Sequence, residues 1–231
     1  MATIRGKPRE DVSVQARGTA RFDIILDAAE QVFGTGYAGA SMREIAERAG
    51  VAQALIHYHF DTKEKLFEAV IARRAGEING QRAQMLDALF AGDDAPRLEE
   101  VIEALFRPTI AVDHDNANSF SRILVSAANS AEERDQLLVQ RYYDPIALKF
   151  IDAFMALTPG LARMNAVWAY MFAIGVGMTM MATTGRPLRL SGGECDDRDV
   201  EAMLARIVPF ICAGVRALAD GDPHIGPRND H

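Results

Sequence analysis

The sequence predicts an all-α protein, with several short helices at the N-terminus followed by a longer helical region. Apolar residues recur at three- and four-residue spacings along almost every segment, which is the period of an amphipathic helix. No segment shows the two-residue alternation of a strand, and there is no internal repeat. With 231 residues, 49% of them hydrophobic, the chain can form one large domain or two small ones with a buried core.

Composition argues against several classes of protein. The two cysteines, Cys195 and Cys212, form no CxxC pair, which argues against a disulfide scaffold or a zinc ribbon and for a reducing compartment. The N-terminus has no apolar signal segment. The most apolar stretch, residues 167–182, contains two glycines and is shorter than a membrane span of ~20 residues. We therefore expect a cytoplasmic protein with no membrane partner.

The first predicted helix covers residues 21–33. Its apolar stripe consists of Phe22, Ile25, Leu26, Ala29 and Phe33. Gly34 and Gly36 end the helix, as glycine often does after the last turn. Residues 1–18 hold four basic and two acidic side chains, and we expect them to form a flexible basic arm.

A second, short helix is predicted over residues 41–49. Ser41 can cap it, and Glu44 lies three residues further on, as in a capping box. Gly50 follows the last helical residue and ends the helix.

The third helix is predicted over residues 52–60, and Thr62 caps a fourth that extends to Leu89. Further helices are predicted at residues 96–112, 118–128, 131–141, 144–157, 161–184 and 197–218. A glycine-rich loop, residues 185–196, joins the last two, and the tail from residue 221 is expected to be frayed.

The second and third helices, joined through a glycine, form a helix-turn-helix pattern. On the third helix Gln53, Ala54 and His57 share one face, whereas Ile56 and Phe60 lie one turn apart on another. The apolar face is expected to pack on the neighbouring helices. The polar face is then able to enter a DNA major groove, which is wide enough for a helix.

Residues 19–70 resemble the DNA-binding domain of the TetR/AcrR family of bacterial repressors. The matching stretches read IILDAAEQVFGTGYAGAS, SMREIAERAGV and AQALIHYHFDTKEKL, and the family's spacing is intact throughout. Two departures stand out. Ala52 replaces the usual Ser or Thr at the start of the third helix, which should cost a cap worth about 1 kcal/mol. His57 and His59 stand where the family commonly has tyrosines.

The resemblance implies an N-terminal three-helix DNA-binding domain over residues 19–66. A larger helical ligand-binding and dimerisation domain follows over residues 67–220, with a tail at residues 221–231. It implies DNA contact for Ser41, Arg43, Gln53, Ala54, His57, Tyr58 and Lys63. Gln53 is the best candidate for reading a base, because glutamine pairs with adenine through two hydrogen bonds. Gln53 and Lys63 can also be ordinary solvated residues.

The histidines fit a metal or catalytic site poorly. His57 and His59 are two residues apart, so they do not face each other on a helix, and no HExxH motif or cysteine accompanies them. We expect His59 to pack between the third and fourth helices and His57 to contact DNA. Protonation of His57 would strengthen a phosphate contact as the pH falls. The segment Asp113-His114-Asp115 is interpreted as a solvated turn.

The resemblance also implies a homodimer, in which helices 161–184 and 197–218 pair with their symmetry mates. Gly175 and Gly177 would permit close approach of these helices. In the helix predicted over residues 161–184, four large side chains fall on one stripe: Met164, Trp168, Met171 and Met178. A helix buried in the core of a single chain needs no ligand, and we favour it for most of these side chains.

An effector pocket is implied among the middle helices. Its candidate lining residues are Phe106, Ile110, Phe120, Leu124, Trp168 and Phe172. Each of them can equally be ordinary core. Methionine adapts to irregular apolar shapes, so an apolar or aromatic effector is expected. Because no nucleophile motif and no phosphate-binding loop occurs, we expect neither an enzyme nor a cofactor.

The net charge of −7 is unevenly distributed. Residues 1–75 carry a charge of +1, and the remainder carries −8, which leaves the N-terminal part compatible with DNA. The expected function is that of a repressor released from a pseudo-palindromic operator by a small molecule. A transcriptional activator is one alternative. Another is an all-helical small-molecule-binding protein or enzyme with a vestigial DNA-binding domain.

Overall fold

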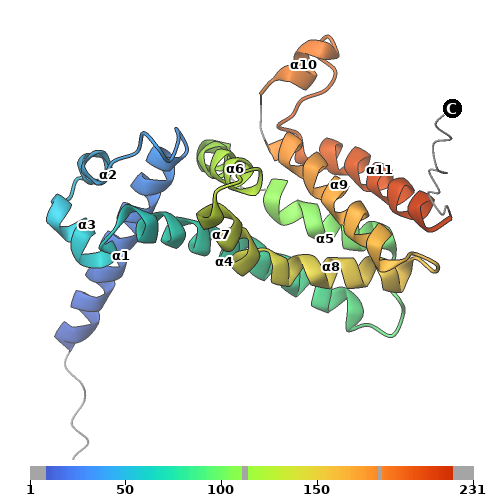
Figure 1. Ribbon diagram of the computed structural model, residues 1–231, viewed down its shortest axis with the longest axis horizontal. Helices are drawn as coiled ribbons and strands as arrows, with labels where there is room; N and C mark the ends of the chain where they lie inside the picture. The colour runs from blue at the N-terminus through green and yellow to red at the C-terminus, as the bar shows by residue number, and fades with distance from the viewer. Residues whose placement is uncertain (1–8, 111–113, 182–183, 221–231) are drawn as a thin grey trace, which may run out of the picture. The chain divides into compact units, whose positions relative to one another are not determined.

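A computed structural model confirms the all-α class (Figure 1). It describes residues 9–110, 114–181 and 184–220, with side chains from residue 20 onward except those of residues 114–118. The helices are α1 (Arg9–Phe33), α2 (Met42–Ala49), α3 (Gln53–Phe60), α4 (Lys63–Phe90), α5 (Leu98–Ile110), α6 (His114–Ala128), α7 (Glu133–Tyr142), α8 (Asp144–Leu157), α9 (Arg163–Met181), α10 (Arg186–Leu190) and α11 (Val200–Asp220). The chain divides into two compact units, Met1–Ala72 and Arg73–His231.

The helix α1 begins earlier than the sequence pattern predicts. The apolar stripe starts at Phe22, but the helical backbone starts at Arg9, inside the segment expected to be an arm. Residues 9–21 contain no proline, so the backbone can continue the helix toward the N-terminus beyond the apolar stripe. Residues 1–8 of the expected basic arm lie outside the described part of the chain.

The first unit has a single apolar core formed by α1, α2, α3 and the start of α4. Its fully buried side chains include Ile25, Val32, Ile45, Ile56, Leu66 and Val70. The Ser41 hydroxyl accepts a hydrogen bond from the Glu44 backbone N–H at 3.1 Å, which confirms the predicted cap of α2. Gly50 ends α2 with φ of +65°, a conformation that favours glycine. Ala52 provides no side-chain cap to α3, as its sequence position predicts.

The second unit is built around α5, α8, α9 and α11, which pack on one another (Figure 1). Three phenylalanines lie at its centre: Phe106, Phe150 and Phe154. The helices α6 and α7 pack against each other and against α9 and α8 respectively. The predicted loop between α9 and α11 contains the short helix α10. A hydrogen bond connects the two ends of this loop: the buried Asp197 carboxylate accepts from the Gly185 N–H at 2.8 Å.

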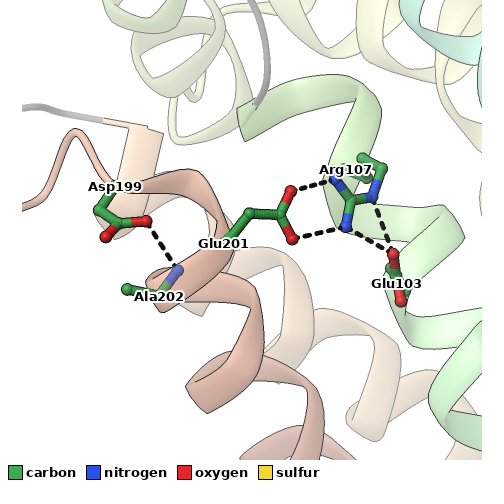
Figure 2. Close-up of polar contacts among 5 residues, drawn as sticks. All are labelled: Glu103, Arg107, Asp199, Glu201 and Ala202. Carbon is green, nitrogen blue, oxygen red and sulfur yellow. Dashed lines mark hydrogen bonds and ion pairs between the residues drawn. The ribbon is translucent and has the colours of Figure 1, made fainter.

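Ion pairs attach α11 to α5 at two places. Arg107 of α5 donates to both carboxylate oxygens of Glu201 at 2.6 and 3.1 Å, and also pairs with Glu103 of its own helix (Figure 2). Arg216 of α11 donates to Glu99 of α5 at 2.7 Å. These arginines hold the pKa values of both Glu201 and Glu99 below their usual range.

The apolar stripe of α9 faces solvent in the single chain. Met164, Trp168 and Met171 are each more than half exposed, so the interpretation of this stripe as core is wrong for them. The helices α9 and α11 are long and apolar enough to pass for membrane spans by length and composition. However, both pack against each other and on α5, which is the arrangement of core-covering helices.

The two glycines of α9 differ in what surrounds them. A Cβ added to Gly177 would lie 2.8 Å from Cε1 of the buried Phe106 ring, so this glycine allows α9 to approach α5 within the chain. Its predicted use between two chains is therefore wrong, because its missing side chain points inward. A Cβ added to Gly175 meets no atom within 4 Å.

Candidate nucleic-acid interface and ligand pocket

The outer face of α3 presents polar side chains to solvent. Gln53, Ala54, His57 and Tyr58 are all exposed, with Tyr58 retaining 82% of its accessible surface. The opposite face is anchored by Ile56 and Phe60, which are buried in the core of the first unit. An exposed polar face on a rigidly packed helix is the arrangement that major-groove reading requires.

The His57 ring contacts residues at both ends of α3. Its Nε2 atom lies 3.3 Å from the Gln53 amide nitrogen, and its Nδ1 atom lies 3.1 Å from the Asp61 carbonyl oxygen. Asp61 has φ of +62° and ψ of −59°, and the Thr62 N–H bonds the Phe60 carbonyl across it, which is a strained γ-turn. If Nδ1 carries the proton, His57 donates to Asp61 and accepts from Gln53.

His59 lies on the surface instead of between α3 and α4, so its prediction as a packed residue is wrong. It is exposed and touches two rings edge-on, Phe22 of α1 at 6.0 Å and Tyr58 at 5.2 Å between centroids. The space beneath α3 is already filled by Phe60, which stacks on Phe22 at 5.0 Å. The helical period therefore places His59 at the edge of the core.

Ser41 and Arg43 lie at the start of α2. Ser41 caps the helix, so its hydroxyl is already engaged with the Glu44 N–H. Arg43 pairs with Glu47 at 2.9 Å, and both side chains are largely exposed. An exposed pair of this kind is worth little, so Arg43 can exchange Glu47 for a phosphate at small cost.

Lys63 has a structural role that its sequence position does not reveal. Its ammonium donates to the carbonyl oxygens of Tyr37 at 3.0 Å and Ala40 at 3.1 Å, and lies 4.3 Å from the centroid of the Tyr37 ring. An ammonium has three N–H donors, so one remains for a phosphate. Tyr37 also donates its hydroxyl to Glu64 at 2.8 Å. Lys63 and Tyr37 together fix the loop that leads into α2.

The second unit contains a cavity of about 270 Å³ bordered by α4 to α9. Of the residues expected to line a pocket, Phe106, Ile110 and Leu124 do so. Phe120 is buried in the packing of α6, and Trp168 and Phe172 are on the outer face of α9. The α9 residues that line the cavity include Tyr170 and Ile174, which lie on the other side of that helix from Trp168 and Phe172.

Several polar residues that border the cavity were not identified from the sequence, among them Arg82 and Tyr143. Arg82 of α4 is 6% exposed and Tyr143 joins α7 to α8. The spacing of α4 could have predicted that Arg82 is buried. It lies four residues after Ile78 and four before Leu86, on the buried stripe of that helix. Nothing comparable marks Tyr143, whose neighbour Tyr142 has the same side chain.

A second, more open hollow of about 890 Å³ lies along α9 and α11. Phe172 and Phe210 border it and are 58% and 68% exposed. Contiguous exposed apolar surface of this kind marks an interaction site. Among the side chains that the structure describes, no group of three or more His, Cys, Asp or Glu lies close enough to hold a metal ion. The segment Asp113 to Asp115 falls outside those side chains.

Two family models match the chain in succession. Residues 25–70 match the bacterial regulatory proteins of the tetR family, and residues 103–214 match the tetracyclin repressor-like C-terminal domain.

Curated relatives are also regulators. The chain is 32% identical over 100 residues to the HTH-type transcriptional activator FasR of Mycolicibacterium smegmatis, which covers 43% of each chain. It is 34% identical over 118 residues to the HTH-type transcriptional regulator BetI of Rhizobium meliloti, covering 50% of this chain and 55% of the relative. The chain therefore matches about half the length of these curated relatives.

Solved structures with the same fold cover nearly the whole chain. The fatty acid degradation regulator FadR from Bacillus halodurans has a TM-score of 0.63 at 16% identity, covering 92% of this chain and 99% of its own. FadR from Bacillus subtilis, solved in complex with stearoyl-CoA, has a TM-score of 0.63 at 16% identity, covering 84% and 98%. At these identities the likeness concerns the fold alone.

Proposed function

Because the chain belongs to the TetR family of bacterial regulatory proteins, we propose that it is a DNA-binding transcriptional regulator that responds to a small effector. Its working form is a cytoplasmic homodimer that binds a pseudo-palindromic operator as a repressor. The two recognition helices α3 then enter major grooves ~34–36 Å apart or a multiple of that distance.

The observation that carries this proposal is the outer face of α3. Its four exposed side chains lie opposite a buried anchor, and the anchor fixes their orientation before DNA arrives. Gln53 is the proposed reader of an adenine, and Tyr58 the proposed neighbour of the backbone. The remaining N–H of Lys63 and the side chain of Arg43 are proposed to meet phosphates.

The cavity of the second unit is the proposed effector site. Phe106, Ile110 and Leu124 give it an apolar wall, which supports an apolar effector. The Bacillus subtilis neighbour, solved with stearoyl-CoA, supports the view that a fold of this kind accommodates an apolar chain. Arg82 of the cavity and Lys63 belong to the same helix α4, which links the effector site to the DNA-binding unit along one element. An effector that prefers one arrangement of α4 shifts the population toward it.

The experiment that tests this proposal is retardation of the protein's own upstream DNA at several salt concentrations. We expect a specific complex whose affinity falls steeply with salt, because phosphate contacts release counterions. Gln53→Ala should weaken specific binding about tenfold, the order expected for one bidentate base contact. Gln84→Ala removes another exposed glutamine, on α4 outside the proposed interface, and should bind as wild type. Absence of a specific complex at low salt would reject the DNA-binding function.

A second candidate function is activation of transcription, because the relative FasR is an activator. A reporter gene behind the bound promoter separates the two. Deleting the regulator raises expression if it represses and lowers expression if it activates.

A further inference from the structure

The cavity of the second unit contains a buried cation without a carboxylate partner. The Arg82 guanidinium donates to the Leu105 carbonyl at 2.9 Å, the Asn79 side-chain oxygen at 3.0 Å and the Thr109 hydroxyl at 2.6 Å. All three acceptors are neutral. Among the described side chains no Asp or Glu forms an ion pair with it, and burial lowers its pKa. Leaving a buried charge uncompensated is costly.

Two N–H groups of the Arg82 guanidinium have no acceptor within the described chain. Arginine has five N–H groups, and three are used by the contacts of Arg82 within the described chain. The other two belong to the terminal nitrogens Nη1 and Nη2. A pair of terminal N–H groups matches the two oxygens of a carboxylate in geometry and charge.

A second unused donor borders the same cavity. The Tyr143 hydroxyl is buried and has no hydrogen-bond partner among the described residues. Burial raises its pKa, so it remains a protonated donor at neutral pH. Buried polar groups are nearly always hydrogen-bonded in native proteins, so an orphaned hydroxyl at a cavity wall indicates a missing acceptor.

We propose that the effector is a small apolar monocarboxylic acid, whose carboxylate is bound by Arg82 and Tyr143 and whose body fills the apolar remainder of the cavity. This proposal rests on the proposed function, since it names the chemical class of the effector. The volume of about 270 Å³ lies near the lower end for ligand pockets, ~300 to 1,000 Å³, so the acid is small.

The charge of the site favours one negative charge on the ligand. Arg82 is the single cationic side chain among the described residues that line the cavity, and Asp144 also borders it. A phosphate dianion would meet one positive charge and a neighbouring carboxylate. Asp144 follows Tyr143 in the chain, but its side chain is exposed, so solvent screens most of its repulsion toward a monoanion.

Calorimetric titration of the full-length protein tests the proposal with two acids of suitable size, octanoate and 4-phenylbutyrate. Each is compared with its primary amide, which has the same shape and no charge. We expect at least one acid to bind about tenfold or more tightly than its amide, the order expected for hydrogen bonds to a charged group. Equal affinities for acid and amide, or no binding of any of the four, overturn the assignment.

The variant Tyr143→Phe gives the sharper test, because it removes a hydroxyl that has no partner in the free protein. Its melting temperature should equal or exceed that of wild type. Its affinity for the acid should fall about 5- to 10-fold, while affinity for the amide changes less. Tyr142→Phe, the same chemical change one residue away and outside the cavity lining, should leave acid binding unchanged. A Tyr143→Phe protein that binds the acid as tightly as wild type contradicts the proposal.

Arg82→Gln should abolish the preference for the acid over its amide. If the Arg82 variant does not fold, the Tyr143→Phe measurement still tests whether the cavity binds a carboxylate. DNA retardation with the same preparation tests the regulatory function separately from the ligand class. If the protein binds its upstream DNA but shows no acid preference, the carboxylate assignment fails and the regulatory function stands. If it prefers the acid but binds no DNA, the regulatory function fails and the ligand class stands.

Discussion

Single side chains in the first unit combine a structural contact with a proposed contact to DNA. Lys63 fixes the loop before α2 through two carbonyl oxygens and has one donor left. Gln53 and His57 hold each other in place on the surface of α3. Such contacts keep the reading side chains in one conformation before DNA arrives, which reduces the entropy lost on binding.

Operator binding is predicted to be stronger when the His57 imidazole is protonated. Protonated His57 has two donor nitrogens, so Nε2 no longer accepts from Gln53, and the added charge attracts phosphate. Affinity measured by fluorescence anisotropy should rise with acidity in wild type and change little in His57→Gln. Identical pH profiles for the two proteins would exclude the idea.

Gly177→Ala is predicted to destabilise the second unit by about 1–3 kcal/mol, the usual cost of overpacking a core. The added methyl group overlaps the Phe106 ring, which is buried and cannot move freely. Gly76→Ala in α4 is the matched control, because open space surrounds that position. It should stabilise the protein by about 0.5–1 kcal/mol. Urea unfolding that gives both variants the same sign would contradict the packing of α9 on α5.

At the scale of the helices, α11 is held on α5 by buried apolar side chains and by an ion pair at each of two places. Arg107 pairs with Glu201, and Arg216 pairs with Glu99, across the contact between α5 and α11. Their exposure limits their contribution to stability, because water screens the attraction. The arrangement of the helices therefore depends mainly on the apolar core.

The double variant Glu99→Gln, Glu201→Gln is predicted to melt below wild type at pH 7, with a difference that shrinks as the pH approaches 3. Both carboxyls have pKa values lowered in the folded protein. Their stabilisation is therefore present above the unfolded pKa of about 4.3 and is lost as they protonate. Calorimetric melting between pH 3 and 7 measures this. Glu194→Gln, an exposed carboxylate without an ion pair in the described chain, should show no such convergence.

At the scale of the whole molecule, the exposed apolar surface of α9 and α11 needs an explanation. Trp168, Phe172 and Phe210 each keep more than half of their surface exposed, although they belong to helices that otherwise pack in the core. Water contact with this much apolar surface is unfavourable. A second copy of the same two helices would cover it through a two-fold interface.

Phe172→Glu combined with Phe210→Glu is predicted to convert a dimer into a monomer. Each substitution places a charge on the hollow between α9 and α11, where its burial in an interface would be costly. Analytical ultracentrifugation should show the apparent mass halved. Leu137→Glu on α7 alters a similarly exposed apolar residue away from this hollow and should remain dimeric. A dimer that survives the double substitution would place the interface elsewhere.

Much of the architecture follows from local patterns that the sequence displays directly. The three- and four-residue period gives the helices, and Ser41, Gly50 and Thr62 give their ends, because caps and glycine conformations act within a few residues. The buried and exposed faces of α3 follow for the same reason. The extended motif identifies the family, since its spacing constrains many positions at once.

The remaining features depend on contacts between residues far apart in the chain. Periodicity shows that α9 has an apolar stripe but not whether that stripe faces the core or solvent, and only the packing on α5 and α8 decided this. Lys63 meets Tyr37 from 26 residues away, and Arg82 and Tyr143 reach one cavity from 61 residues apart. The sequence by itself thus determined the family and most of the helices, but not the start of α1 or the short helix α10. The tertiary structure decided which side chains meet, because burial and pairing depend on neighbours that the local pattern does not specify.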